Sequence, residues 1–119
     1  MKKVYHLATC STCQKILKIW NLKKEFQQQD IKTEKMTAKQ VDEMIMLAGS
    51  AEALFSRRAL KYQSMGLKDK KLTEKDIRQL IIDEYTFLKR PVLIIDKKIF
   101  IGNAPTIVKE AKTYLNSLS

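Results

Sequence analysis

Residues 4–13 read VYHLATCSTC, a short apolar run that changes abruptly into small polar residues around two cysteines. The run from Val4 to Leu7 is typical of a strand. Apolar residues return at helical spacing between Ile16 and Trp20. The pattern therefore predicts a strand, a loop and a helix, with the cysteine pair at the point where the helix begins.

Cys10 and Cys13 are placed for nucleophilic chemistry. Backbone N–H groups and the positive end of the helix dipole would face the Cys10 sulfur, and both stabilise a thiolate. The thiolate is the form that attacks a disulfide, a peroxide or an oxyanion centre. Cys13 lies one turn later on the same side of the helix, where it can resolve an intermediate as a disulfide. We therefore expect Cys10 to be the nucleophile, with a lowered pKa, and Cys13 to be the less accessible partner.

The cysteine pair has two other interpretations, inert packing in the core or half of a zinc site. A structural zinc site needs four ligands, and the chain has one histidine, His6, and no third cysteine. Redox or nucleophilic chemistry is favoured because a strand-to-helix context makes the CxxC spacing informative, and no metal is expected. A single histidine at the end of a strand is more often structural than catalytic.

The middle of the chain is predicted to be helical. A short second strand is expected at residues 30–32, which would complete a βαβ unit. Thr37 and Thr73 each begin a capping-box pattern, and each is followed by apolar residues at helical spacing. Short helices are expected between these two segments, at residues 51–67.

The C-terminal part is predicted to be a hairpin followed by a helix. Pro91 precedes a continuous apolar run, and residues 96–98 form a turn into a second apolar run. Asn103 is expected to cap a last helix, whose apolar face extends from Ile107 to Leu118. The length of the chain predicts one domain, residues 1–119.

The chain is strongly basic, with 23 Lys and Arg against 13 Asp and Glu and a net charge of +10. Such a charge can serve nucleic acid, an acidic partner or an oxyanion. The sequence has no aromatic-interleaved basic stripe and no nucleic-acid motif, so solvated helix faces are favoured and no direct nucleic-acid binding is expected. No apolar run approaches the roughly 18 residues that span a bilayer, and two cysteines are too few for a secreted scaffold. We therefore expect a cytoplasmic protein without membrane contact.

Three segments resemble the ArsC/Spx family, namely residues 5–13, the pair Arg90-Pro91 before an apolar strand, and residues 101–103. The resemblance covers essentially the whole chain. It implies an α/β, thioredoxin-like fold in which a helical insertion separates the βαβ unit from a C-terminal ββα unit. It also implies a cis peptide bond before Pro91, at the strand that faces the cysteine motif. The family includes glutaredoxin-coupled arsenate reductases and Spx-type transcription regulators.

The resemblance to the arsenate reductases implies roles for single residues. Their essential cysteine matches Cys10, a nearby histidine matches His6, and an anion-binding arginine matches Arg90. A second family arginine falls at residues 57–58, where Arg58 fits the pattern better than Arg57. A third family arginine has no counterpart, because residues 102–103 are Gly-Asn. Arsenate reduction is therefore expected to be weak.

A tetrahedral oxyanion is expected beside the nucleophile. Helix N-termini are natural anion sites, so the backbone N–H groups of Ser11, Thr12 and Cys13 are expected to hold it. Planar guanidinium groups bind such anions through paired hydrogen bonds, which Arg90 would supply, with Arg58 as a second contact.

The two activities in the family imply different partners. The reductases imply glutaredoxin or thioredoxin as electron donor and glutathione as co-substrate, with no bound cofactor. The regulators imply a redox-switched cysteine pair and binding to the C-terminal domain of the RNA polymerase alpha subunit, in a region that residues 49–51 roughly occupy. Cys13 is absent from the arsenate reductases and present in many Spx proteins. A thiol-disulfide oxidoreductase is the favoured interpretation, and a redox-switched regulator is the alternative.

Overall fold

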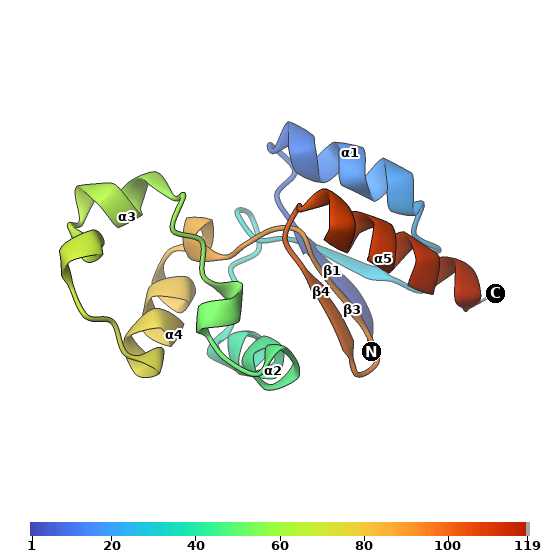
Figure 1. Cartoon of the computed structure of the whole chain (residues 1–119). Helices are drawn as coiled ribbons and strands as arrows, with labels where there is room; N and C mark the ends of the chain where they lie inside the picture. The colour runs from blue at the N-terminus through green and yellow to red at the C-terminus, as the bar shows by residue number, and fades with distance from the viewer. Residues whose placement is uncertain (119) are drawn as a thin grey trace. The chain divides into compact units, whose positions relative to one another are not determined.

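The computed structural model describes residues 1–118, which divide into two compact units (Figure 1). Unit 1 joins Met1–Glu34 to the part of the chain from Arg90 onward. Unit 2 is Lys35–Lys89, the predicted helical insertion. The position of the one unit relative to the other is not determined. Within residues 1–118, no helix is long and apolar enough to cross a membrane.

Unit 1 is built on a four-stranded sheet in the order β2-β1-β3-β4. The two N-terminal strands are parallel and are joined through helix α1, whereas β3 is antiparallel to β1 and forms a hairpin with β4. This topology is the α/β, thioredoxin-like fold that the resemblance implied. The elements are β1 (Lys2–His6), α1 (Ser11–Trp20), β2 (Gln27–Asp30), β3 (Val92–Ile95), β4 (Lys98–Ile101) and α5 (Pro105–Ser117).

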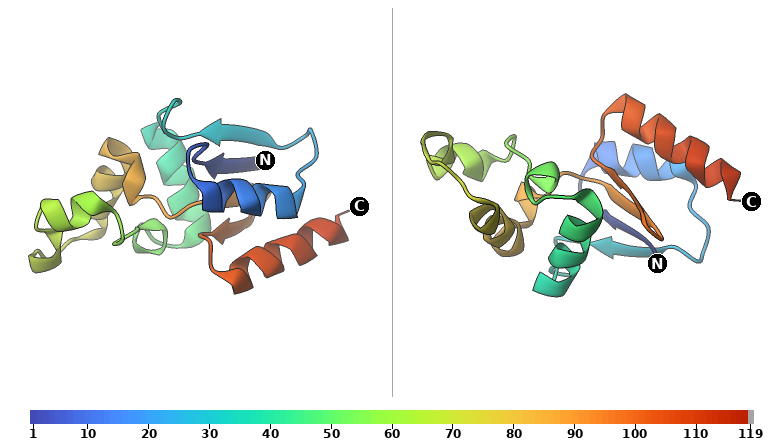
Figure 2. Two further views of the ribbon diagram at one scale, coloured as in Figure 1. Left: turned by 90° about the horizontal axis from the view of Figure 1, so that it is seen from above. Right: turned by 60° about the horizontal axis from the view of Figure 1, so that its bottom comes forward.

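Helices α1 and α5 lie side by side against one face of this sheet (Figures 1 and 2). Val4 and Leu93 are cross-strand partners on that face, and both are fully buried. They pack with Ile16 and Trp20 of α1 in one apolar core. The Trp20 indole N–H also donates to the Val108 carbonyl of α5 at 3.1 Å. The core thus holds α1, with the cysteines at its start, firmly against the sheet.

Unit 2 is helical, as predicted. Both capping boxes are present. The threonine side chain accepts the backbone N–H three residues later, and the side chain of that later residue accepts the backbone N–H of the threonine. The pairs are Thr37 with Gln40 and Thr73 with Asp76. Gly49 ends the first of these helices in the left-handed conformation, at a φ of 92°. The helices are α2 (Ala38–Ala48), α3 (Leu60–Ser64) and α4 (Glu74–Asp83), with 3₁₀ turns at Glu52–Leu54, Leu67–Asp69 and Tyr85–Phe87.

The predicted position of the second strand is wrong. The strand is Gln27–Asp30 rather than residues 30–32, although three of its four residues are glutamines. Its outer edge carries no further strand in the described part of the chain, and an edge strand tolerates such polar residues. The Asp30 carboxylate accepts the backbone N–H of Lys32 at 3.2 Å, a local bond that turns the chain out of the strand.

The predicted cap of the last helix is also wrong. The N-cap residue of α5 is Ala104, which makes no side-chain cap bond, and Pro105 is the first helical residue. The N–H of Gly102 donates to the Pro91 carbonyl at 2.9 Å, so the pairing of the hairpin continues past β4 and the helix starts later. Leu118, predicted on the apolar face, lies just beyond the helix and is exposed.

Candidate active site

Two of the candidate residues, His6 and Pro91, lie next to each other at one end of the sheet in unit 1. His6 ends β1 and lies directly opposite Asp30 at the end of β2. The next position of the β1–β3 register places Pro91 on the other side of His6. The hydrogen bond from Gly102 to Pro91 continues the row into the chain after β4. Asp30, His6, Pro91 and Gly102 therefore form a row across the end of the sheet.

Cys10 is the N-cap residue of α1, and its side chain is half-buried. Its backbone N–H donates to the Leu7 carbonyl at 3.0 Å, and its carbonyl accepts the backbone N–H of Gln14 at 3.1 Å. The Gln14 side-chain amide also donates to the Leu7 carbonyl, at 3.3 Å. These bonds fix the turn that carries the thiol. Ser11 and Thr12 form the exposed first turn of the helix beside it.

The pKa of Cys10 is lowered from its ordinary value. Partial burial of the thiol acts in the opposite direction and raises the pKa. Three hydrogen bonds to the Cys10 sulfur lower the pKa and contribute to outweighing this effect. They come from the backbone N–H of Cys13, the thiol of Cys13 and the backbone N–H of Thr12. The positive charge of Arg90 lowers the pKa further. The helix start and the arginine thus favour the Cys10 thiolate, which is the reactive form.

The pKa of Cys13 moves the other way, to about 11. Burial is the main cause, since the Cys13 side chain is fully enclosed, and a backbone hydrogen bond at Leu7 only partly offsets it. The adjacent negative charge of Cys10 raises the pKa as well. Both cysteines are free thiols in this structure. At neutral pH one partner is therefore prepared to react while the other keeps its proton.

Asp30 is a residue that the sequence analysis missed. Its carboxylate accepts the backbone N–H of Ala8 at 3.5 Å, in the loop that leads to Cys10. It also faces His6, whose side chain is 8% exposed and whose Nδ1 atom has no hydrogen-bond partner within residues 1–118. Burial lowers the pKa of His6, and the Asp30 charge partly opposes that shift. Asp30 is an acidic residue at the carboxyl end of a strand parallel to β1, a position that could have marked it as a site residue. The strand was predicted at residues 30–32 instead, so Asp30 was not recognised as the end of the strand.

The titration of His6 follows from these surroundings. Because burial disfavours the imidazolium form, we expect His6 to titrate below 6.5, its ordinary pKa, and Asp30→Asn to lower that pKa further. The unfolded chain then binds the proton more readily, so stability is lost as the pH falls below about 6.5. The protein has a single histidine, so its imidazole resonance in an NMR pH titration reports this pKa without assignment. A midpoint above 6.5, or an upward shift in Asp30→Asn, would contradict the description of the site.

Arg90 and Pro91 connect β3 to the cysteines. The peptide bond between them is cis, as predicted, and Pro91 is buried whereas Arg90 is half-buried. The positive charge of Arg90 acts on both thiols. It lowers the pKa of Cys10, and it opposes the rise in the pKa of Cys13. The structure therefore brings Arg90 together with the cysteine pair in unit 1.

The two other candidate arginines belong to unit 2 and differ in their contacts. Arg57 forms an ion pair with Glu52 and lies over the rings of Phe55 and Tyr62, at 5.2 and 6.0 Å from their centroids. Arg58 is exposed and makes no ion pair with any residue from 1 to 118. The guanidinium that is available for a ligand is thus that of Arg58. Both arginines belong to unit 2, whereas Cys10 belongs to unit 1.

No metal centre is formed by the residues that the structure describes. Within residues 1–118, no three side chains among His, Cys, Asp and Glu are grouped so that they could hold a metal ion.

The fold and the cysteine pair define a thioredoxin-like protein with a thiol site. The family model described as ArsC family matches residues 5–111, and the chain belongs to this family. The comparison with curated protein sequences found no match.

Solved structures with the same fold span nearly the whole chain. An arsenate reductase from Vibrio cholerae is 17% identical, with a TM-score of 0.76 over 92% of this chain and 98% of that chain. An arsenate reductase (ArsC) related protein from Brucella melitensis is 21% identical, with a TM-score of 0.69 over 92% of both chains. A Staphylococcus aureus protein is 26% identical, with a TM-score of 0.71 over 92% of this chain and 97% of that chain. These likenesses show that the chain shares its fold with these proteins over nearly its whole length.

Proposed function

We propose that this chain is a thiol-disulfide oxidoreductase that reduces arsenate or a related oxyanion, with Cys10 as nucleophile and Cys13 as the resolving thiol. The observation that carries the proposal is that the two thiols differ in burial and in pKa. The pKa of the half-buried Cys10 is lowered, whereas the buried Cys13 has a pKa of about 11. A nucleophile and a protonated reserve thiol are the parts that a two-step thiol reduction needs.

In the first step the Cys10 thiolate attacks the arsenic atom of arsenate. A sulfur–arsenic bond forms, and one oxygen leaves as water after taking up protons. The N–H groups of Thr12 and Cys13 that point at the Cys10 sulfur, together with those of the first helical turn at Ser11, would bind the oxygens of the anion. Arg90 would add a charge-assisted hydrogen bond. Arg58, free of an ion pair in unit 2, is proposed as the second arginine contact.

In the second step a further thiol attacks the Cys10 sulfur. The negative charge of Cys10 is gone once the adduct has formed, which removes one cause of the raised pKa of Cys13. Cys13 then loses its proton and attacks, and the sulfur–arsenic bond breaks. Its two electrons pass to arsenic, arsenite is released, and a Cys10–Cys13 disulfide remains. Glutathione can take the same step from solution, but Cys13 is already in place.

The resulting disulfide has to be reduced for a further turnover. We propose glutaredoxin or thioredoxin as the electron donor, with glutathione as a co-substrate where it replaces Cys13. Two free cysteines at this spacing suit a reducing compartment, and we place the protein in the cytoplasm. His6, buried next to Pro91 in the row at the end of the sheet, is proposed as a supporting residue of the site rather than a catalyst.

A second candidate function is a regulator that binds the RNA polymerase alpha subunit under control of the same cysteine pair. One observation favours it. Met46, on α2 shortly before residues 49–51, is 82% exposed, and exposed methionine is common at protein contact surfaces. The second candidate predicts co-purification with RNA polymerase that depends on the redox state of Cys10 and Cys13, without turnover.

The test of the proposed function is an NADPH-coupled assay with arsenate as substrate. Glutaredoxin with glutathione and thioredoxin with its reductase are compared as donors. The proposal expects arsenate-dependent NADPH oxidation with at least one donor system, and a Cys10–Cys13 disulfide after a single turnover without donor. No oxidation with either donor, together with redox-dependent capture of RNA polymerase, would favour the regulator instead.

A further inference from the structure

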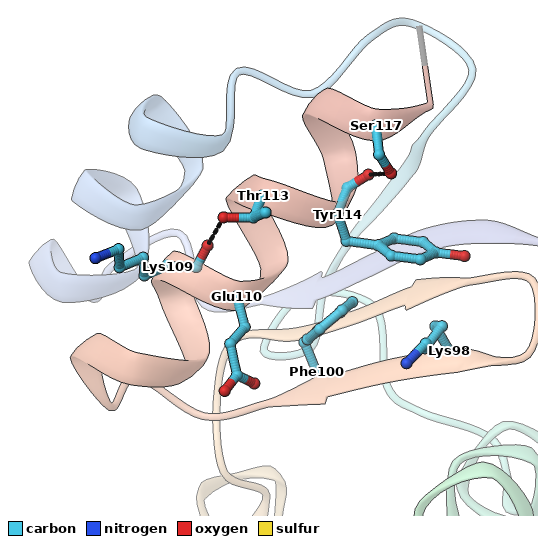
Figure 3. Close-up of a pocket in the computed structure, with 7 residues that line it drawn as sticks. All are labelled: Lys98, Phe100, Lys109, Glu110, Thr113, Tyr114 and Ser117. Carbon is cyan, nitrogen blue, oxygen red and sulfur yellow. Dashed lines mark hydrogen bonds between the residues drawn. The ribbon is translucent and has the colours of Figure 1, made fainter.

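A groove of about 480 Å³ runs between β4 and α5 in unit 1, apart from the row of residues at the cysteine site (Figure 3). On α5 the lining residues from Glu110 to Ser117 recur three or four positions apart, along one side of the helix. On β4 it is lined by two alternate residues, which share one face of the strand. The groove is lined by Lys98 and Phe100 from β4, and by Lys109, Glu110, Thr113, Tyr114 and Ser117 from α5. The Lys109 side chain points away from Phe100 (Figure 3).

The groove has an apolar floor with opposite charges at its ends. The rings of Phe100 and Tyr114, both half-buried, form the floor, with centroids 5.9 Å apart. Figure 3 shows Glu110 on one side of Phe100 and Lys98 on the other. The Lys98 ammonium group lies 5.7 Å from the Tyr114 ring centroid. Neither charged group forms an ion pair within residues 1–118, so each can serve a ligand.

The strand beside the groove is the edge of the sheet, with part of its backbone free to pair. The N–H of Gly102 donates to Pro91, which marks this pair as hydrogen-bonded in the antiparallel ladder. Hydrogen-bonded pairs alternate with non-hydrogen-bonded pairs, so the backbone groups of Ile99 and Ile101 point away from β3. Within residues 1–118 they meet no further strand. These groups can accept an added strand next to the groove.

We propose that this groove binds an extended segment of a partner protein, which adds to β4 as an antiparallel strand. Pairing with Ile99 and Ile101 places alternate side chains of the segment on the groove side of the sheet. The central side chain of the segment would lie over Phe100, so it should be apolar. The side chain two positions later in the segment would lie at Lys98, so it should be acidic. The side chain two positions earlier would lie toward Glu110, so it should be basic. The recognised pattern, from N to C, is basic-x-apolar-x-acidic.

The test uses two fluorescein-labelled peptides whose cores are Lys-Thr-Leu-Thr-Glu and Glu-Thr-Leu-Thr-Lys, with binding followed by fluorescence anisotropy. The protein should prefer the first peptide by about three- to tenfold. The first peptide forms two exposed ion pairs with Lys98 and Glu110, whereas the second places like charges beside them. The double variant Lys98→Glu/Glu110→Lys should reverse this preference. The matched double variant Lys23→Glu/Glu43→Lys has the same net charge and should keep it.

A third peptide tests the strand addition itself. N-methylation of both threonines removes the N–H groups that pair with Ile99 and Ile101, and should weaken binding by about tenfold or more. Circular dichroism of each variant checks that the fold is kept. Equal binding of the two charge patterns, no reversal in Lys98→Glu/Glu110→Lys, or full binding of the methylated peptide would overturn the proposal. These outcomes do not depend on the chemistry of Cys10, so the two proposals can fail separately.

Discussion

Replacing Cys10 with serine should lower substrate-dependent NADPH oxidation about a thousandfold or more, to the background of the coupled assay. The helix start and Arg90 lower the pKa of Cys10, which favours its thiolate form. A serine hydroxyl at the same place has no comparable tendency to ionise and cannot form a disulfide. The measurement is the arsenate-dependent rate with each donor system, and circular dichroism shows that the fold is unchanged.

Cys13→Ser is the matched control for this variant. Glutathione can attack the Cys10 adduct in place of Cys13, so this variant should keep turnover when glutathione and glutaredoxin are supplied. It should lose turnover with thioredoxin alone, which requires the internal disulfide. If Cys10→Ser remains active while Cys13→Ser is inactive with both donors, the assignment of nucleophile and resolving thiol is wrong.

Replacing Arg90 with alanine should reduce turnover by about ten- to a hundredfold. A charge-assisted hydrogen bond contributes about 1.5–3 kcal/mol, which corresponds to a rate factor of that size. The variant also loses a charge that lowers the pKa of Cys10, so its rate should depend more steeply on pH near neutrality. The measurement is kcat/KM for arsenate as a function of pH.

Arg57→Ala is the control for Arg90→Ala. Arg57 is bound to Glu52 and covers two aromatic rings in unit 2, so its loss should change the rate little. Arg58→Ala is expected to cost less than Arg90→Ala but more than Arg57→Ala. If Arg90→Ala keeps the activity of the unmodified protein, Arg90 has no part in binding the anion.

If the chain reduces arsenate as proposed, we expect the neutral residues after β4 to limit the rate. Residues 102–103 are Gly-Asn where the arsenate reductases of the resemblance carry an arginine. Gly102 donates its N–H to Pro91, and Asn103 is exposed, so neither supplies a positive charge to the row at the sheet end. Weak arsenate reduction is the expected result, and a related substrate with less negative charge should be reduced better.

Elements with strong local signals could be predicted from the sequence. The capping boxes at Thr37 and Thr73 and the left-handed Gly49 mark helix ends by bonds within a few residues. The apolar run of β3 and the turn after it mark the hairpin in the same way. The strand Gln27–Asp30 has no such signal, because it is a strand only through its pairing with β1. Lys2 and Lys3 likewise extend β1 by pairing with β3.

The candidate site could be predicted where one residue type carries the chemistry. Cys10 and Cys13 were identified because a thiol at a helix start is informative by itself. Asp30 could not be found, because its role depends on the register that sets it opposite His6. The difference between Arg57 and Arg58 depends on Glu52 and the aromatic rings beside Arg57, which only the folded unit brings together.

The most direct test of the account is the titration of the two thiols. Thiolate absorbance is followed against pH, and alkylation at neutral pH is mapped by mass spectrometry. We expect the first thiolate to form below the ordinary pKa of a cysteine, and Cys10 to be alkylated well before Cys13, whose pKa is about 11. Alkylation of Cys13 first, or a Cys10 pKa at or above the ordinary value, would contradict the central claim that the start of α1 activates Cys10.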